Sequence, residues 1–152
     1  MGIKAMNKKH GLVIAMACCL WVGLASAEAV KPIKSSRADV AGGIFSRADA
    51  VKSSADGFES VDVIRYESKD AAFQTGMYKS GPMREEKQAP GMPYDEFLYF
   101  TSGGVKLTST DGSVIDVNAG ESVTIPKGWT GVFETAGYEK MYVIYDAAAV
   151  KP

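Results

Sequence analysis

The sequence predicts an all-β fold, a small antiparallel β-barrel or sandwich, for the part of the chain that follows residue 60. From Val61 onward, short runs rich in Val, Ile, Tyr, Phe and Thr are separated by turn residues, a pattern typical of strands. Asp111-Gly112 lies between two such runs, and because both residues tolerate positive φ, the pair indicates a hairpin. No long helical stretch interrupts the runs. About eight strands at this spacing favour a sandwich or a small barrel.

The expected strands consist mainly of β-branched and aromatic residues, which suit a pleated, half-buried surface. We place them at residues 61–66, 75–79, 97–101, 105–109, 113–117, 122–125, 131–135 and 140–145. Turns rich in Gly, Pro, Asn and Asp separate the later strands. We place these turns at residues 102–104, 111–112, 118–120, 126–128 and 136–137. Residues 84–87 form a run of mixed charge, which we interpret as a solvated loop.

Residues 1–27 are predicted to be a cleaved secretory signal peptide. Three lysines precede an apolar run over residues 12–25, and Ala25-Ser26-Ala27 fits a small-residue cleavage site. The run is shorter than the roughly 20 residues that a membrane helix needs. We therefore expect cleavage after Ala27, export to the periplasm or the extracellular space, and no membrane attachment of the mature chain. The alternatives are an uncleaved anchor and a lipoprotein with Cys18 or Cys19 lipidated.

Removal of that segment limits the chemistry of the mature chain. Both cysteines, Cys18 and Cys19, and the single histidine, His10, lie inside it. A chain without Cys or His has no disulfide, no thiolate or imidazole metal site and no histidine-activated nucleophile. Without the three lysines of the segment, 14 of the 17 Lys and Arg remain against 18 Asp and Glu, a net charge of about −4. Nucleic acid and anionic membranes are therefore not expected as partners.

Residues 28–58 are rich in Ala, Ser, Lys, Asp and Gly and contain few large apolar side chains. This composition predicts a flexible N-terminal arm with loose or partner-dependent structure, with a candidate short helix near residues 47–53. The β domain is expected over residues 59–147, followed by a C-terminal tail, residues 148–152.

Two spacings within the β domain resemble those of the cupin superfamily. Its motifs are G-x5-H-x-H-x3-4-E-x6-G and G-x5-P-x-G-x2-H-x3-N. Here Glu96 precedes Gly103 by the spacing of the first motif, and Gly120, Pro126 and Gly128 match the second. Residues 60–146 thus resemble a single-domain cupin. This resemblance implies a jelly roll, or double-stranded β-helix.

The chain is most similar to the cupin subgroup named after (S)-ureidoglycine aminohydrolase. The subgroup's runs around the two motifs, and a late lysine before the last strand, have counterparts here. They are Glu96, Gly103, Leu107-Thr108, Asp111-Gly112, Ala119-Gly120, Ile125-Pro126, Gly128-Trp129, Gly131, Phe133 and Lys140.

The metal ligands of the cupin motifs are replaced in this chain. The two histidines of the first motif fall near residues 90–92, which are Pro-Gly-Met, and the histidine and asparagine of the second are Gly131 and Thr135. Only Glu96 remains, and transition-metal sites need three or four protein ligands. We therefore expect no metal and no cofactor. An oxygen-only site for Ca²⁺ or Mg²⁺, built from Glu96, Asp95 and Glu134, is the alternative.

The candidate site is an aromatic-lined cup around Glu96. Strand alternation places Glu96 and Leu98 on one face, and Lys140 and Tyr142 on one face of the last strand. If Glu96 points into the mouth of the barrel, as the resemblance implies, Leu98 follows it inward. The expected ligand-binding residues are Tyr78, Tyr94, Glu96, Leu98, Trp129, Lys140 and Tyr142. Glu96 is also the candidate catalytic residue, as a proton donor or acceptor.

Each of these residues also has a structural interpretation. Glu96 suits a rim carboxylate paired with a lysine, and Lys140 suits a salt-bridging residue at a strand end rather than a clamp for a substrate carboxylate. The tyrosines suit core or rim positions, and Trp129 suits a packing role under its turn as well as stacking on a ligand.

Two functions follow from this site. The first is an exported, metal-independent protein that binds a small polar molecule in the cup near Glu96. The second is a small hydrolase or isomerase that acts on a nitrogen-rich polar metabolite, with Glu96 as acid–base and Lys140 or a tyrosine as the electrophilic partner. The lack of histidine favours binding over catalysis. The resemblance also implies homodimers, formed through sheet faces or exchanged N-terminal strands.

Overall fold

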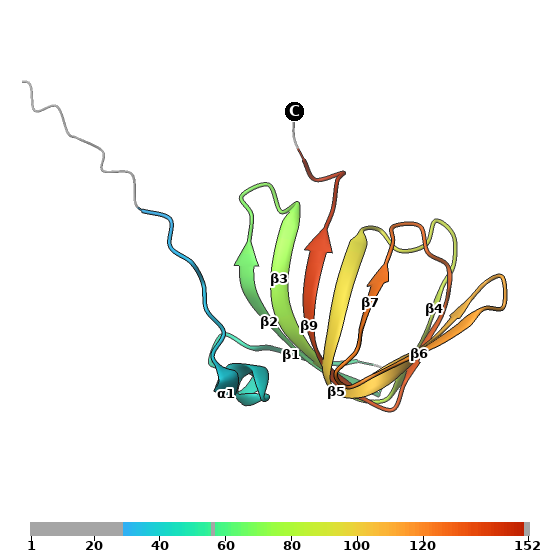
Figure 1. Cartoon of the computed structure of the whole chain (residues 1–152), viewed down its shortest axis with the longest axis horizontal. Coiled ribbons are helices and arrows are strands. Elements are labelled where there is room, and N and C mark those ends of the chain that lie inside the picture. The colour runs from blue at the N-terminus through green and yellow to red at the C-terminus, as the bar shows by residue number, and fades with distance from the viewer. Residues whose placement is uncertain (1–28, 56, 151–152) are drawn as a thin grey trace, which may run out of the picture. The chain divides into compact units, whose positions relative to one another are not determined.

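A curled antiparallel sheet makes up most of the described chain (Figure 1). The structure is a computed structural model, and it describes residues 29–55 and 57–150. Residues 1–31 and 32–152 are separate units, and the following description concerns the second. Within the described residues the sheet has nine strands. The predicted all-β fold is confirmed.

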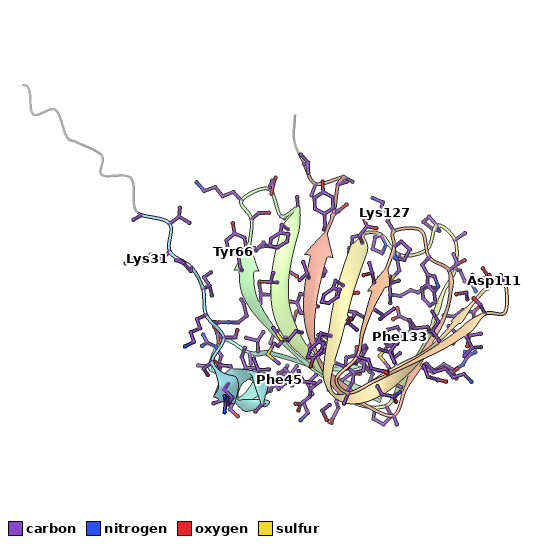
Figure 2. The ribbon with its side chains drawn as sticks, in the orientation of Figure 1. Lys31, Phe45, Tyr66, Asp111, Lys127 and Phe133 are labelled. Atoms are coloured by element: carbon purple, nitrogen blue, oxygen red, sulfur yellow. The ribbon has the colours of Figure 1, made fainter. Side chains whose placement is uncertain are left out.

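The strands pair in the order β1-β2-β3-β9-β5-β8-β4, and β6 and β7 each pair with β5. Their bounds are β1 Val51–Ala55, β2 Phe58–Glu67, β3 Phe73–Ser80, β4 Met83–Lys87, β5 Asp95–Ser109, β6 Val114–Asn118, β7 Ser122–Ile125, β8 Gly131–Thr135 and β9 Tyr138–Tyr145. The loop with the predicted Asp111-Gly112 turn joins β5 and β6, and Asp111 lies at its tip (Figure 2).

Strand β5 connects the two halves of the sheet. Its first part pairs with β7 and β9, and its second part pairs with β6 and β8. The expected turn at residues 102–104 is wrong, because the strand continues through a bulge between Phe100 and Ser102. Gly103 has a φ of +67° there, and a side chain at this position would collide with the Gly137 carbonyl oxygen. Glycine therefore lets the strand bend without ending.

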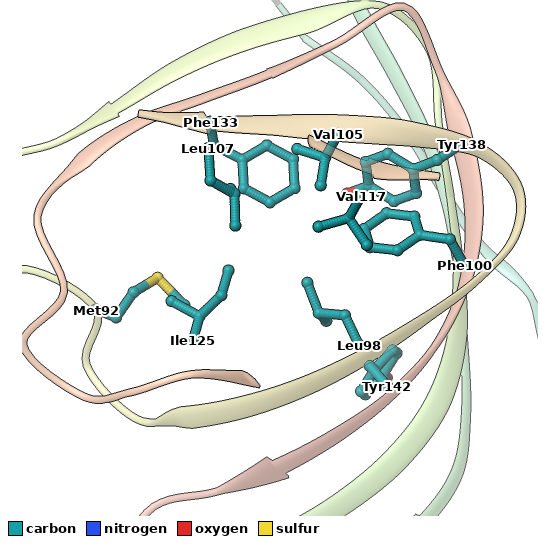
Figure 3. Packing of buried hydrophobic residues seen from close by; sticks show 10 residues of the cluster. All are labelled: Met92, Leu98, Phe100, Val105, Leu107, Val117, Ile125, Phe133, Tyr138 and Tyr142. Atoms are coloured by element: carbon teal, nitrogen blue, oxygen red, sulfur yellow. The ribbon is translucent and has the colours of Figure 1, made fainter. Parts of the chain in front are cut away.

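The main hydrophobic core lies inside the curl, where side chains from both halves of the sheet meet (Figure 3). Leu98 and Phe100 are fully buried, so alternation along β5 directs them inward as expected. The Phe100 ring packs edge-on against Tyr138, with 5.4 Å between the ring centroids. The buried members of this core are Met92, Leu98, Phe100, Val105, Leu107, Val117, Ile125, Phe133, Tyr138 and Tyr142.

Residues 36–55 form regular structure, whereas the sequence predicts a flexible arm over residues 28–58. Helix α1 (Arg37–Val40) begins with a capping box, in which Ser36 and Asp39 bind each other's backbone N–H groups. The 3-10 helix η1 (Gly43–Ser46) follows it. The short helix expected near residues 47–53 is wrong, because part of this range belongs to strand β1.

A second, smaller core holds this segment against the outer face of the sheet. Ile44 and Phe45 of η1 are buried with Val63 of β2 and Met77 of β3. Figure 2 labels Phe45. The composition of residues 28–58 does not predict this contact, because it has few large apolar residues. Two adjacent ones, Ile44 and Phe45, are nevertheless enough to anchor the segment.

The charged run 84–87 is also a strand rather than the expected loop. Strand β4 pairs antiparallel with β8, and Arg84 lies opposite Glu134. The side chains of Arg84, Glu85 and Glu86 are exposed, so their solvation agrees with the expectation. A short, charged strand at the end of a sheet is a common way to protect its edge from aggregation.

No helix in the described part of the chain is long and apolar enough to cross a membrane. The predicted signal peptide, residues 1–27, lies outside the described residues. Its cleavage and the export of the chain therefore stay predictions.

Replacing Ile44 by Ala tests whether the segment belongs to the folded unit. Ile44 is fully buried, so the change leaves a cavity, and we expect the free energy of unfolding to fall by about 2–4 kcal/mol. Urea unfolding followed by circular dichroism measures it. Val30→Ala, at a position that is 98% exposed, is the control and should change stability by less than about 0.5 kcal/mol. Equal effects of the two variants would contradict the packing of η1.

Candidate functional site

A cavity of about 790 Å³ opens on the inner face of the curled sheet, beside the main core. Such a volume suits a small organic molecule. Six aromatic rings line it, together with aliphatic and charged side chains. Its lining residues are Gly57, Phe58, Asp62, Gln74, Tyr78, Pro82, Met83, Arg84, Glu85, Lys87, Met92, Tyr94, Glu96, Ile125, Phe133, Tyr138, Lys140, Tyr142 and Ile144. Figure 3 shows Met92, Ile125, Phe133, Tyr138 and Tyr142 converging on the interior.

The register of three neighbouring strands places three polar residues of the cavity in one row. Asp62 of β2 lies opposite Tyr78 of β3, and Tyr78 lies opposite Lys140 of β9. Tyr142 is two residues further along β9 and faces the same side of the sheet. Glu96 enters from β5, where it lies opposite Ile144.

Glu96 and Lys140 form a buried ion pair at the wall of the cavity. The Lys140 ammonium donates a hydrogen bond to Glu96 Oε1 over 2.9 Å. Glu96 is 8% exposed and Lys140 is 7% exposed. The Lys140 Nζ atom also lies 5.6 Å from the ring centroid of Tyr78 and 5.5 Å from that of Tyr138. The electron-rich ring faces thus help to solvate the buried ammonium.

A second polar contact joins Asp62 and Tyr142. The Tyr142 hydroxyl donates to Asp62 Oδ1 over 3.0 Å. Burial, followed by the charge of Asp62, raises the pKa of Tyr142, so the phenol stays protonated and acts as a donor. Burial also raises the pKa of Asp62, although its hydrogen bond to Tyr142 acts in the opposite direction. Gly76 makes room for this contact, because a side chain there would collide with the Tyr142 ring.

The other charged residues of the cavity have partners of opposite charge. Lys87 pairs with Glu85, and Arg84 Nε lies 3.2 Å from Glu134 Oε1. Among the described residues, Asp62 makes no ion pair. It is therefore the charged group of the cavity wall that is left without a neutralising partner.

Most of the residues expected at the site line one cavity. Tyr78, Tyr94, Glu96, Lys140 and Tyr142 all do so. The expected pairing of Glu96 with a lysine occurs, but the pair is buried rather than at an exposed rim.

Two expected residues do not line the cavity. Leu98 is enclosed in the main core. The Trp129 indole N–H donates to Ser109 Oγ over 3.0 Å, and the Trp129 ring lies against the backbone of Gly131.

Sequence reasoning missed several residues of the wall, most notably Asp62. Seven others are apolar or aromatic: Phe58, Met83, Met92, Ile125, Phe133, Tyr138 and Ile144. The rest are Gly57, Gln74, Pro82, Arg84, Glu85 and Lys87. The signal for Asp62 was available, because it interrupts the apolar run Val61-Asp62-Val63-Ile64 of a strand. A charged residue on the inner face of a strand calls for a partner or a ligand.

The residues at the positions of the cupin metal ligands do not fit a transition metal. A side chain at Gly131 would collide with the Thr108 carbonyl oxygen, and one at Gly91 would collide with the backbone of Gly128 and Trp129. Neighbouring backbone thus leaves no room for imidazole at Gly131, nor at Gly91 within the range 90–92. The remaining carboxylate, Glu96, accepts a hydrogen bond from an ammonium.

The alternative oxygen-only site is not assembled either. Asp95 accepts a hydrogen bond from the Lys127 backbone N–H, and Glu134 pairs with Arg84 across the β4–β8 ladder. Neither Asp95 nor Glu134 pairs with Lys140, the partner of Glu96. Among the described residues, no group of three or more carboxylates, histidines or cysteines is arranged to hold a metal ion.

Solved structures of several bacterial proteins share this fold. A protein of unknown function of the DUF861 family from Pseudomonas syringae pv. tomato is 20% identical, with a TM-score of 0.56 over 62% of this chain, and the match covers 43% of that protein's length. The Clostridium difficile EutQ protein is 20% identical, with a TM-score of 0.51 over 66% of this chain and 78% of its own. A Rhizobium leguminosarum protein of unknown function is 19% identical, with a TM-score of 0.52 over 77% and 99% of the two chains.

At this level of identity these structures show the fold alone. No curated protein matches the chain, and the finer similarity to the (S)-ureidoglycine aminohydrolase subgroup stays a prediction. Residues 67–142, half of the chain, match the EutQ-like cupin domain family. Those residues include β3 to β8, most of β9 and the cavity residues Tyr78, Glu96 and Lys140. The chain therefore belongs to the EutQ-like cupin domain family.

Proposed function

We propose that the protein is a metal-independent cupin that binds a small polar molecule in the cavity beside Glu96. The observation that carries this proposal is the cavity itself, about 790 Å³ in volume, with six rings and a buried ion pair in its wall. Apolar walls with a few fixed polar groups are typical of small-molecule sites. The ion pair fixes the orientation of two polar groups before any guest arrives, which lowers the entropic cost of binding.

Binding is favoured over catalysis by the state of the ionisable groups. Glu96 and Lys140 neutralise each other, so neither stands free as a base or an electrophile. Tyr142 stays protonated and already donates to Asp62. The alternative, a hydrolase or isomerase acting on a nitrogen-rich polar metabolite, is supported by the position of Glu96 in the cavity, next to a proton donor.

Export and self-association are further parts of the proposal. Export rests on the sequence of residues 1–27. Homodimers are supported by aromatic residues that are 38–47% exposed on the strands of the sheet, because exposed apolar side chains often mark protein contacts. These residues are Tyr66, Phe73, Phe97, Tyr99 and Tyr145.

Binding can be tested by NMR titration of ¹⁵N-labelled protein with a mixture of small polar amines, alcohols and carboxylic acids. We expect the shifted amides to cluster on β3, β5 and β9 around the cavity. Ile144→Trp fills the cavity and should abolish these shifts. Val143→Trp, the neighbouring position on the opposite face of β9, is the matched control. Shifts that persist in Ile144→Trp, or that map to the outer face, would contradict the proposal.

The ion pair predicts an asymmetric response to mutation. Lys140→Met leaves Glu96 buried without a partner and should lower the free energy of unfolding by about 3–5 kcal/mol. The double variant Glu96→Leu/Lys140→Met removes both charges and should recover most of that loss. Urea unfolding measures both. Arg84→Met breaks an exposed pair and should cost less than about 1 kcal/mol. If the double variant were no more stable than Lys140→Met, the pair would not be buried as described.

A further inference from the structure

We propose that the guest of the cavity is a small organic cation, that Asp62 neutralises its charge and that the surrounding rings form its walls. This inference rests on the proposed binding function, because it names the class of molecule that the cavity holds. Three observations carry it: the pairing of the charged side chains in the wall, the arrangement of the rings and the field at the tyrosine hydroxyls.

The pairing of the charged side chains leaves a place for one positive charge beside Asp62. Six charged side chains line the cavity, and five of them take part in ion pairs. Asp62 is the sixth, and among the described residues it has only the Tyr142 hydroxyl as a side-chain hydrogen-bond partner. The three acidic and three basic side chains of the wall sum to zero, but Arg84 is paired with Glu134, which lies outside the wall. The charge of Asp62 is therefore unpaired, and a cation beside it would neutralise that carboxylate. An anion there would add a second uncompensated negative charge at a half-buried position, which is unfavourable.

The rings of the wall suit a cation as well. Tyr78 lies opposite Asp62 in the sheet, and Phe58 and Tyr94 line the same cavity. The faces of such rings attract ammonium and guanidinium groups. This cavity already holds one cation in that way, since the Lys140 ammonium lies 5.6 Å from the Tyr78 centroid. The same chemistry is therefore available to a guest.

The tyrosine hydroxyls report a negative field. Burial raises the pKa of Tyr94, and the next contributions come from the carboxylates of Glu96, Glu85 and Asp62. For Tyr142, the charge of Asp62 is the next contribution after burial. These carboxylates disfavour a phenolate and favour a cation in the same space, whereas burial, the larger cause of both shifts, disfavours any unpaired charge.

The Lys140 ammonium does not oppose this assignment. Its charge is largely compensated by Glu96 at 2.9 Å. At Asp62 the attraction of Lys140 exceeds the repulsion of Glu96, but both are smaller than the effect of burial, which raises the pKa of Asp62. An anionic guest would have to draw Lys140 away from Glu96, which would leave a buried carboxylate without a partner. The cation is therefore favoured over the anion on both sides of the cavity.

Three probes of the same shape and different charge test the inference: cyclohexylammonium, cyclohexanol and cyclohexanecarboxylate. Calorimetric titration of the purified protein at neutral pH should give an affinity for cyclohexylammonium at least about tenfold higher than for the other two. Equal or tighter binding of the alcohol or the carboxylate would overturn the cation assignment and leave the binding function standing. Binding of none of the three would overturn both.

Asp62→Asn locates the effect. It should weaken cyclohexylammonium binding at least about tenfold and leave cyclohexanol binding unchanged. Asp116→Asn, at an exposed position of β6 outside the cavity, is the matched control and should bind all three probes like the wild type. Unchanged cyclohexylammonium affinity in Asp62→Asn would overturn the role of Asp62.

The melting temperature separates this role from a structural one. Because burial raises the pKa of Asp62 in the folded protein, stability falls as the pH rises from the ordinary carboxyl pKa through the raised one, and the full cost is present above it. Asp62→Asn should therefore melt no lower than the wild type at neutral pH. If it melts lower, Asp62→Glu decides: recovery of cyclohexylammonium affinity by this charged variant supports the proposal, and no recovery overturns it.

Discussion

The ion pair between Glu96 and Lys140 is the interaction on which the interior of this cupin depends. It joins neighbouring strands β5 and β9 and lies in the wall of the cavity. Two charges that are each less than a tenth exposed can only be tolerated together. The rings of Tyr78 and Tyr138 complete the environment of the ammonium. A change of either Glu96 or Lys140 therefore affects the other residue and the polarity of the cavity as well.

Three glycines determine which side chains fit in and around the interior. Gly131 stands where the second cupin motif has an imidazole, and Gly91 lies within residues 90–92, where the first motif has its histidines; at both glycines neighbouring backbone takes the space of a side chain. Gly76 has the opposite effect, because its missing side chain lets Tyr142 lie over β3 and reach Asp62. Carboxylates, an ammonium and phenols thus lie in the interior of this cupin domain.

Much of the fold could be predicted from the sequence, because alternation and turn residues are local signals. Alternation along β5 placed Glu96 and Leu98 on one face, and the resemblance to cupins implied that this face points inward. The bend of β5 was mistaken for a turn, because Gly103 and Gly104 suit both. Strand β4 was missed because a charged edge strand has no apolar pattern.

The site was less accessible from the sequence, because its contacts join distant residues. Asp62 meets Tyr142 only because β2, β3 and β9 are neighbours in the sheet, and that order is not visible along the chain. Ile44 and Phe45 likewise find their partners on the outer face of two later strands. Trp129 was assigned to the cavity from its place beside the second motif, but its indole is bonded to Ser109 instead.

The metal content of the purified protein tests the central claim most directly, because that claim gives Glu96 an ammonium partner in place of a metal. Elemental analysis by mass spectrometry, after purification without chelators, should find Mn, Fe, Ni and Zn far below one ion per chain. One tightly held transition ion per chain, lost together with the Glu96→Gln substitution, would contradict this account.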